Sequence, residues 1–252
     1  PLAWTLLFGI TGMAPFLMGG TLPAMVRALS LNADRIGLGG GRMYAANTAG
    51  AIAGTLVSSF FLIPAFGILG TALAAACLGT LAGAGGFWLS RSTPPRERDI
   101  QEAKPAPVTN MAAVAILFYA AAGGLALGYE VVWSQSAVQL MSTRSFAFSV
   151  MLATYLAGLA LGAALFARWA DRARNPWGVF GLLVGAAGLI ALLELSLLGG
   201  WLPGLQSRGE QLAWLLTGSR LTGMCARFAV AAVYLVFIPT LLLGAAFPAA
   251  LK

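Results

Sequence analysis

The chain of 252 residues contains no histidine, two lysines and two cysteines. Without histidine, bis-histidine haem ligation, histidine-containing zinc sites and acid–base catalysis by histidine are excluded. Lys104 lies in a charged stretch and Lys252 ends the chain, so no lysine is placed to hold retinal in mid-membrane. Cys77 and Cys225 lie in apolar stretches and form no disulfide framework. We identify no catalytic residue and expect neither a metal nor a cofactor.

Charge is also scarce. Charged residues make up 9% of the chain and hydrophobic residues 59%, with a mean hydropathy of +0.85. A soluble domain usually carries about 25% charged residues, and disorder requires low hydrophobicity with high charge. No G-x-x-x-x-G-K-[ST] loop occurs, which excludes a P-loop nucleotide site. The composition therefore predicts an all-α polytopic membrane protein.

Long apolar runs predict about seven transmembrane helices, since a span needs about 20 such residues. The expected ranges are 2–29, 43–64, 67–90, 111–140, 145–169, 177–198 and 221–251. The first range contains Pro15 and Pro23, and the last contains Pro239 and Pro248. Because proline breaks the regular hydrogen-bond ladder, we expect these two helices to be bent. The segment 199–220 mixes apolar and charged residues and predicts a short amphipathic helix on the outer interface.

The distribution of basic residues predicts the orientation of the chain in the membrane. Eleven of the fifteen follow the first, third, fifth and seventh helices, and four lie toward the other side. The loops 30–42, 91–109 and 170–176 are therefore expected in the cytoplasm, and we expect the membrane to be the bacterial inner (plasma) membrane. This loop asymmetry accounts for the pI near 10.1, so no nucleic-acid partner is expected.

An internal repeat is indicated by LMGGTLPA at 17–24 and LLGAAFPA at 242–249, which agree at four of eight positions. Each copy lies late in a proline-containing helix with the same direction, so the repeat spans six helices. Residues 1–92 then hold the last three helices of a first half, 93–109 a cytoplasmic linker, and 110–252 the first four helices of a second half. We therefore expect a segment of a longer protein with major-facilitator-like six-helix repeats, cut at both ends.

A loop motif points the same way. GAALFARWADRARN at 162–175 resembles the major-facilitator motif in which glycine, then Asp-Arg and further basic residues, follow the second helix of a half. The resemblance implies a gating role for Asp171 and Arg172. The glycine expected after Asp-Arg is replaced here, and an ordinary positive-inside loop is the alternative interpretation.

Four stretches carry a more specific resemblance: PFLMGGTLPAMVR (15–27), RMYAANTAGAIAGTLVSSFFLIPAFG (42–67), GLALGYEVVWSQ (124–135) and FAFSVMLATYLAGLALGAALFARWADR (146–172). Together they are similar to the membrane region of the spermidine-synthase-like, or fused transporter–spermidine synthase, family. In that family a soluble aminopropyltransferase domain follows, and its glycine-rich loop and acidic putrescine-binding residues have no counterpart here. The resemblance thus implies a membrane module without enzymatic activity of its own. It implies a soluble synthase domain or other membrane subunits as partners, besides the bilayer.

Glu130 lies within the predicted helix 111–140, between Tyr129 and Trp133. A carboxylate inside a membrane costs at least about 2.5 kcal/mol on insertion scales, so it is paired or functional. Our hypothesis is that Glu130, with Tyr129, Trp133 and Asn47, binds a small cationic metabolite. The alternatives are a structural hydrogen bond for Glu130 to a neighbouring helix end, and interhelical hydrogen bonding for Asn47.

Two further sets of residues are predicted to hold helices against one another. Glu194 and Arg227 lie at equal depth near the outer ends of their helices, which predicts a structural ion pair, with a substrate site as the alternative. Small residues at G-x-x-x-G spacing let helix backbones approach closely in a membrane. We therefore expect packing faces on two helices, formed by Gly50 with Gly54 and by Gly158 with Gly162.

Two functions are compatible with these features. In the first, the chain transports a small cationic metabolite such as a polyamine, or presents it to a partner domain. In the second, it is a non-catalytic integral subunit or scaffold of a larger membrane complex. Transport predicts a polar cavity that contains Glu130, whereas a scaffold predicts a filled interior and a helix surface covered by another chain.

Overall fold

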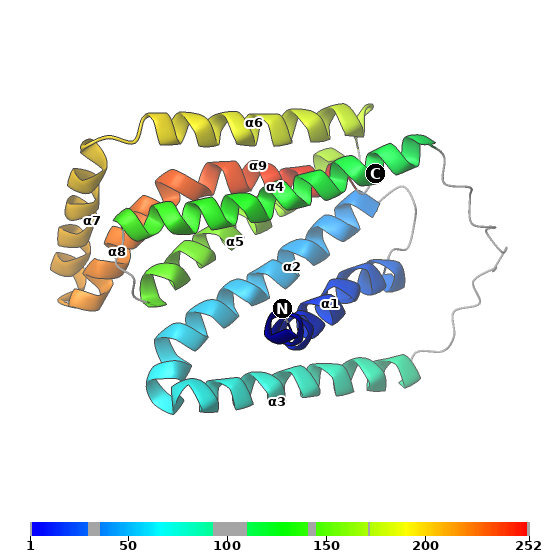
Figure 1. Ribbon diagram of the computed structural model, residues 1–252, viewed down its shortest axis with the longest axis horizontal. Helices are drawn as coiled ribbons and strands as arrows, with labels where there is room; N and C mark the ends of the chain where they lie inside the picture. The colour runs from blue at the N-terminus through cyan, green and yellow to red at the C-terminus, as the bar shows by residue number, and fades with distance from the viewer. Residues whose placement is uncertain (1, 30–35, 93–109, 141–144, 171, 251–252) are drawn as a thin grey trace. The chain divides into compact units, whose positions relative to one another are not determined.

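The computed structural model describes residues 2–29, 36–92, 110–140, 145–170 and 172–250. These residues are helical throughout apart from short turns, and no strand occurs among them (Figure 1), as the composition predicts. In chain order the elements are α1 (Leu2–Leu29), α2 (Ile36–Val57), η2 (Ser58–Leu62), α3 (Ile63–Ser92), α4 (Asn110–Leu140), α5 (Ser145–Ala170), α6 (Pro176–Ser196), α7 (Trp201–Thr217), α8 (Arg220–Ala232), η3 (Val233–Phe237) and α9 (Ile238–Ala250). The two η elements are π-helices.

Among the described residues, four helical stretches are long and apolar enough to cross a membrane: Gly39–Ser92, Phe146–Ala170, Pro176–Ser196 and Arg220–Ala250. The first of them is interrupted at Gly67, whose φ of 68° is one that residues with a side chain rarely adopt. This break falls at the first residue of the helix predicted at 67–90. The all-helical architecture is confirmed, and the four long apolar stretches suggest a membrane protein, while the number of seven spans and the six-helix repeat remain predictions.

Several predicted features lie outside the described residues. These are the linker 93–109, part of the loop 30–42, and Asp171. The cytoplasmic placement of the loops and the division into two membrane halves therefore remain predictions. The predicted amphipathic segment 199–220 is helical over Trp201–Thr217.

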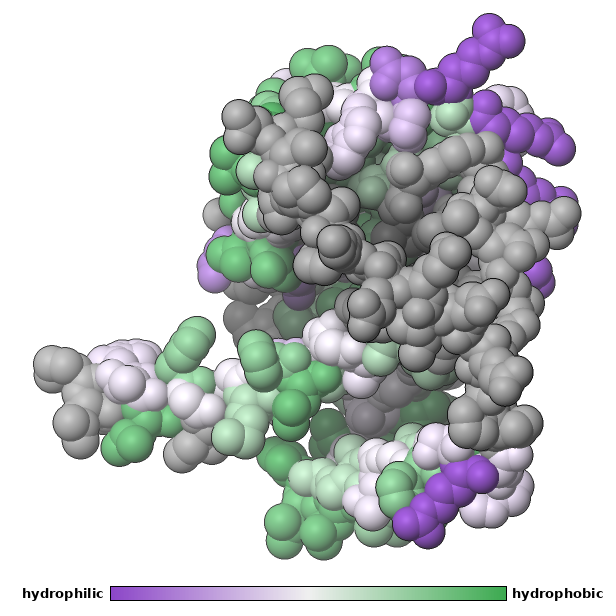
Figure 2. All heavy atoms as spheres, turned by 90° about the vertical axis from the view of Figure 1, so that its right-hand side faces the viewer, coloured by the Kyte–Doolittle hydropathy of each residue, from purple (hydrophilic) through white to green (hydrophobic). Residues whose placement is uncertain are grey.

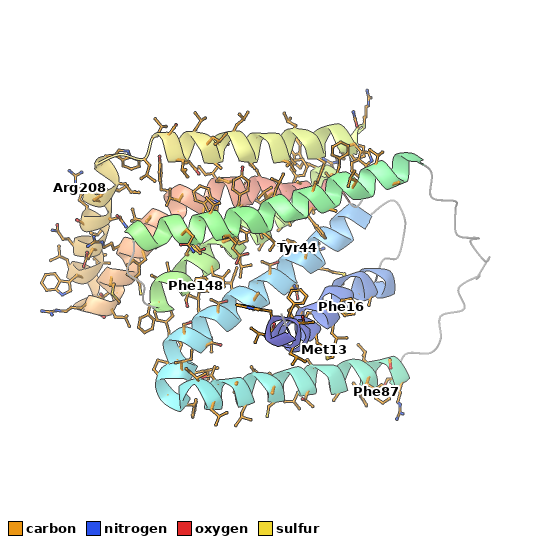
Figure 3. All side chains as sticks on the ribbon, in the orientation of Figure 1. Met13, Phe16, Tyr44, Phe87, Phe148 and Arg208 are labelled. Carbon is orange, nitrogen blue, oxygen red and sulfur yellow. The ribbon has the colours of Figure 1, made fainter. Side chains whose placement is uncertain are left out.

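The described chain forms two compact units, residues 56–127 and residues 1–55 with 128–252. In the first unit α3 packs against η2, and Thr71 is buried and donates its hydroxyl to the carbonyl of Gly67 at 2.7 Å. In the second unit, large apolar side chains of α1 such as Met13 and Phe16 are exposed and stand out from the helix (Figure 3). Apolar residues reach the surface widely in the space-filling view (Figure 2), as expected of helices that face lipid.

The second unit is held together by the last helix. α9 packs against both α5 and α6, and α8 packs against α5 and α7. A methyl group at Gly158 would collide with Thr240, and one at Gly162 would collide with the backbone of Leu241. The predicted packing face of Gly158 and Gly162 is thus confirmed. Gly50 and Gly54 differ, since no described atom lies within 4 Å of an added Cβ there.

Both π-helices end two residues before a proline. η2 precedes Pro64, and η3 precedes Pro239. Proline has no N–H and its ring crowds the carbonyl one turn earlier, so a wider turn relieves the clash. The buried hydroxyl of Thr240 donates toward the carbonyls of Val236 at 2.8 Å and Phe237 at 3.0 Å. The expected irregularity of the last helix is therefore a π turn, whereas α1 continues as one α-helix through its two prolines.

Candidate functional site

The aromatic residues predicted to bind substrate lie in the apolar core of the second unit. Trp133 on α4 is 2% exposed and packs with Tyr155 of α5, Ala191 of α6 and the η3 residues Leu235 and Val236. Tyr129 packs against the same cluster, with its ring centroid 6.3 Å from that of Trp133. The rings of Tyr129 and Trp133 pack α4 against α5, α6 and η3. The described contacts therefore indicate a packing role for both residues.

Glu130 lies beside this core and is half-buried. It interacts electrostatically with Tyr155, which also interacts with Tyr44 of α2. No hydrogen bond or ion pair joins Glu130 to any residue that the structure describes. The structural hydrogen bond considered from sequence is therefore not formed with a described residue.

On α2, the residue that reaches the core is Tyr44 rather than Asn47. The ring of Tyr44 stacks on Phe247 of α9 with centroids 4.4 Å apart, and the buried Thr48 donates to the Tyr44 carbonyl at 2.8 Å. Asn47, in contrast, is exposed. Sequence reasoning missed Tyr44, although it lies one turn before Thr48 on the same helix face.

The predicted ion pair between Glu194 and Arg227 is wrong, because Arg227 has a different partner. Its Nη1 lies 3.3 Å from Oε2 of Glu210 on α7, with side chains 42% and 40% exposed. The amide of Gln206 on α7 also donates to the Arg227 carbonyl at 3.3 Å. The prediction failed because α7 packs on α8 and brings Glu210 next to Arg227.

Glu194 itself is buried near the C-terminal end of α6. The residue is 7% exposed, and no described group lies within hydrogen-bonding distance of its Oε2. Its backbone carbonyl accepts the hydroxyl of Tyr234 at 3.0 Å, and the ring of Tyr234 meets Trp201 edge-on at 4.8 Å. Glu194 thus has a buried carboxylate without a described counter-charge, and its backbone is hydrogen-bonded to Tyr234 of the π-helix η3.

The two residues of the loop motif are not brought to this site by the structure. Asp171 is outside the described residues. Arg172 is exposed, and its backbone N–H donates to the Trp169 carbonyl at 3.0 Å where α5 ends. Their gating role remains a prediction.

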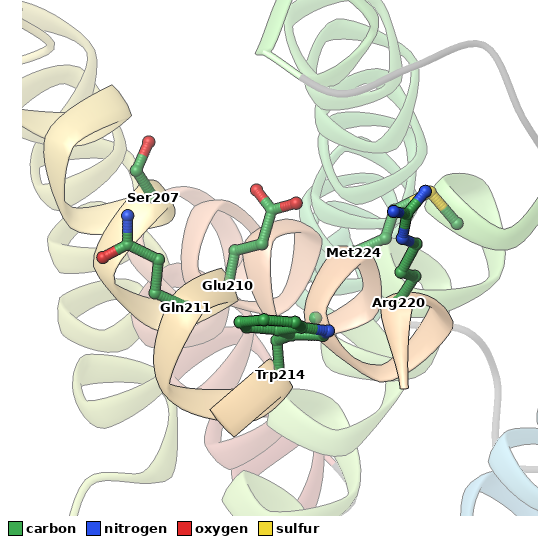
Figure 4. Close-up of a pocket in the computed structure, with 7 residues that line it drawn as sticks. Ser207, Glu210, Gln211, Trp214, Arg220 and Met224 are labelled. Carbon is green, nitrogen blue, oxygen red and sulfur yellow. The ribbon is translucent and has the colours of Figure 1, made fainter. Parts of the chain in front are cut away.

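A pocket of about 650 Å³ lies between α7 and α8 and was not predicted. Figure 4 shows side chains from both helices around it. Its lining residues are Ser207, Glu210, Gln211, Trp214, Arg220, Gly223 and Met224. The first four share one face of α7 at i, i+3, i+4 and i+7 spacing, and the others begin the same pattern on α8. This spacing can be read from the sequence and could have predicted that these residues lie on facing surfaces of the two helices.

Comparison of the chain with protein-family models, curated proteins and solved structures gives no match.

Proposed function

We propose that this chain is the membrane module of a spermidine-synthase-like protein, and that it transports a small cationic metabolite such as a polyamine or presents it to a partner domain. The observation that carries the proposal is Glu194. Its side chain is buried and its Oε2 lacks a partner among the described residues, while its backbone carbonyl accepts the hydroxyl of Tyr234, whose ring meets Trp201.

Physical chemistry favours a cation at this position. Burying an ionised carboxylate without a counter-charge is costly, so such groups in membrane helices are paired or serve a function. An ammonium group would neutralise the carboxylate and would also be attracted to the faces of nearby aromatic rings. Tyr234, which is hydrogen-bonded to the backbone of Glu194, and Trp201 form an aromatic pair in this region.

Glu130 adds a second carboxylate in the same unit, and it interacts electrostatically with Tyr155. A polyamine carries several ammonium groups along a flexible chain, so it can use more than one acidic site. Tyr129 and Trp133 pack in the apolar core and lie close to Glu130 in sequence, and Asp171 with Arg172 would gate access. No catalytic step is assigned to this chain.

The test is uptake of radiolabelled spermidine into liposomes that contain the purified protein. We expect Glu194→Gln and Glu130→Gln to reduce uptake by about tenfold or more, since a charge-assisted hydrogen bond contributes about 1.5–3 kcal/mol. The matched control is Glu210→Gln, which removes a carboxylate already paired with Arg227. Uptake that is unchanged in both Glu194→Gln and Glu130→Gln would contradict the proposal.

The second candidate is a non-catalytic integral subunit or scaffold of a larger membrane complex. It is favoured by the open face of Gly50 and Gly54, which no described atom covers. Small residues of this kind are typical of helix–helix contacts in membranes. The mass of the complex extracted gently from native membranes distinguishes the two candidates when combined with uptake. A stable complex with another subunit, and no uptake by the isolated chain, would favour the scaffold.

A further inference from the structure

The pocket between α7 and α8 differs in charge from the site of Glu194. Its ionised side chains are Glu210 and Arg220, and Arg227 lies next to Glu210. The Glu210 carboxylate is paired with Arg227 at 3.3 Å. Arg220 has no hydrogen bond or ion pair with any described residue, so one positive charge remains unpaired. The pocket therefore favours an anionic group and disfavours a polyamine.

The position of Arg220 is not explained by helix stability. It is the first residue of α8, and a cation in the first turn of a helix opposes the helix dipole by about 0.3–1 kcal/mol. The helix is instead capped by Ser219, whose hydroxyl oxygen accepts from the Thr222 N–H at 3.4 Å. The guanidinium of Arg220 therefore lies beside the pocket even though its charge lowers the stability of α8.

The walls of the pocket combine polar and apolar groups. Gln211 and Ser207 contribute an amide and a hydroxyl, while Trp214 extends from α7 toward α8 (Figure 4). Gly223 allows the close approach, since an added Cβ would lie 3.1 Å from the Glu210 carbonyl oxygen. Trp214 and Met224 are the apolar side chains that line the pocket, and the exposed Leu215 and Leu216 follow Trp214 on α7. An anionic head that carries apolar chains matches this combination.

We propose that the α7–α8 pocket binds the phosphate-bearing headgroup of a phospholipid, with the guanidinium of Arg220 on the phosphate and Trp214 beside the glycerol and first acyl carbons. Guanidinium groups recognise phosphate oxygens through two parallel hydrogen bonds. Tryptophan favours the membrane interface, where lipid headgroups lie. This inference is independent of the proposed transport function.

The experiment measures binding of dioctanoyl-phosphatidylglycerol to the purified full chain in detergent. We expect Arg220→Gln to weaken binding by about tenfold, as expected for loss of a charge-assisted hydrogen bond. Arg220→Lys, which keeps the charge but loses the planar fork, should weaken it by about threefold. The control Arg208→Gln removes the same charge from a side chain on α7 that projects away from the helices (Figure 3), and should leave binding unchanged.

Two further ligands show how much of the binding affinity comes from the phosphate and how much comes from the acyl chains. Dioctanoylglycerol has the acyl chains without the phosphate, and glycerol 3-phosphate has the phosphate without the chains. Both should bind more weakly than dioctanoyl-phosphatidylglycerol. The proposal is overturned if Arg220→Gln and Arg208→Gln have equal effects, or if either partial ligand binds as tightly as the lipid.

Discussion

At the scale of single residues, the sequence shows which polar side chains lie in the apolar helices. It does not show which groups those side chains contact. Sequence position placed Glu194 and Arg227 at similar depth, yet a partner also depends on the rotation of each helix about its axis. The structure turns Arg227 toward Glu210 on α7 and leaves Oε2 of Glu194 without a described partner. Glycine spacing was more informative at Gly158 and Gly162, because close helix contact needs only a small side chain.

The contact at Gly162 gives a stability prediction. Gly162→Ala places a methyl group against the Leu241 backbone, so we expect overpacking to cost about 1–3 kcal/mol. The control is Gly181→Ala on α6, where no described atom lies within 4 Å of the added Cβ. Thermal unfolding in detergent should show a lower Tm for Gly162→Ala alone. Equal Tm values for the two variants would refute the close packing of α5 on α9.

A second residue prediction concerns the ion pair of Arg227. Because both side chains are about two-fifths exposed, the pair should contribute no more than about 1 kcal/mol. We expect Glu210→Gln to change the Tm by less than Gly162→Ala does, measured under the same conditions. A larger loss for Glu210→Gln would mean that the pair stabilises the contact of α7 with α8 far more than an exposed pair can.

At the scale of elements, apolar runs predicted most helices to within a few residues, because length and hydropathy determine a span. The main difference is the start of α2 at Ile36 instead of residue 43. The π-helices were not predicted. A proline indicates that the regular backbone hydrogen bonds of a helix are interrupted, but it does not indicate which groups then satisfy the freed carbonyls. At η3 the compensation includes the buried hydroxyl of Thr240, which no local sequence pattern indicated.

This arrangement predicts the effect of removing the Thr240 hydroxyl. Thr240→Val keeps the shape but leaves buried carbonyl oxygens of η3 without that donor, at a cost of about 1–3 kcal/mol. Thr217→Val is the matched control, because Thr217 donates to the Ala213 carbonyl from an exposed position. Thermal unfolding of both variants tests the prediction. A smaller loss for Thr240→Val than for Thr217→Val would argue against a structural role at the π turn.

At the scale of the whole molecule, composition alone identified the class of protein, because so few charged residues cannot cover a soluble surface. The repeat, the orientation and the family resemblance are tested neither by the described residues nor by the comparisons, and they remain predictions. The pocket between α7 and α8 was missed because 199–220 was treated as an interfacial helix and not as a packing partner of α8.

The orientation is testable by chemical labelling. In a background with Cys77 and Cys225 replaced by serine, Arg208→Cys should react with a membrane-impermeant maleimide added to intact spheroplasts. Lys104→Cys should react only after the membrane is permeabilised, because the positive-inside rule places 91–109 in the cytoplasm. The reverse labelling pattern would refute the predicted orientation.

The proposed transport function requires that a buried carboxylate of this chain, Glu194, binds a small organic cation. Its most direct test is equilibrium binding of radiolabelled spermidine to the purified protein in detergent, compared among the wild type, Glu194→Gln and Glu210→Gln. We expect saturable binding that Glu194→Gln abolishes and Glu210→Gln retains. Binding by Glu194→Gln that equals the wild type, or no saturable binding by the wild type, would contradict it.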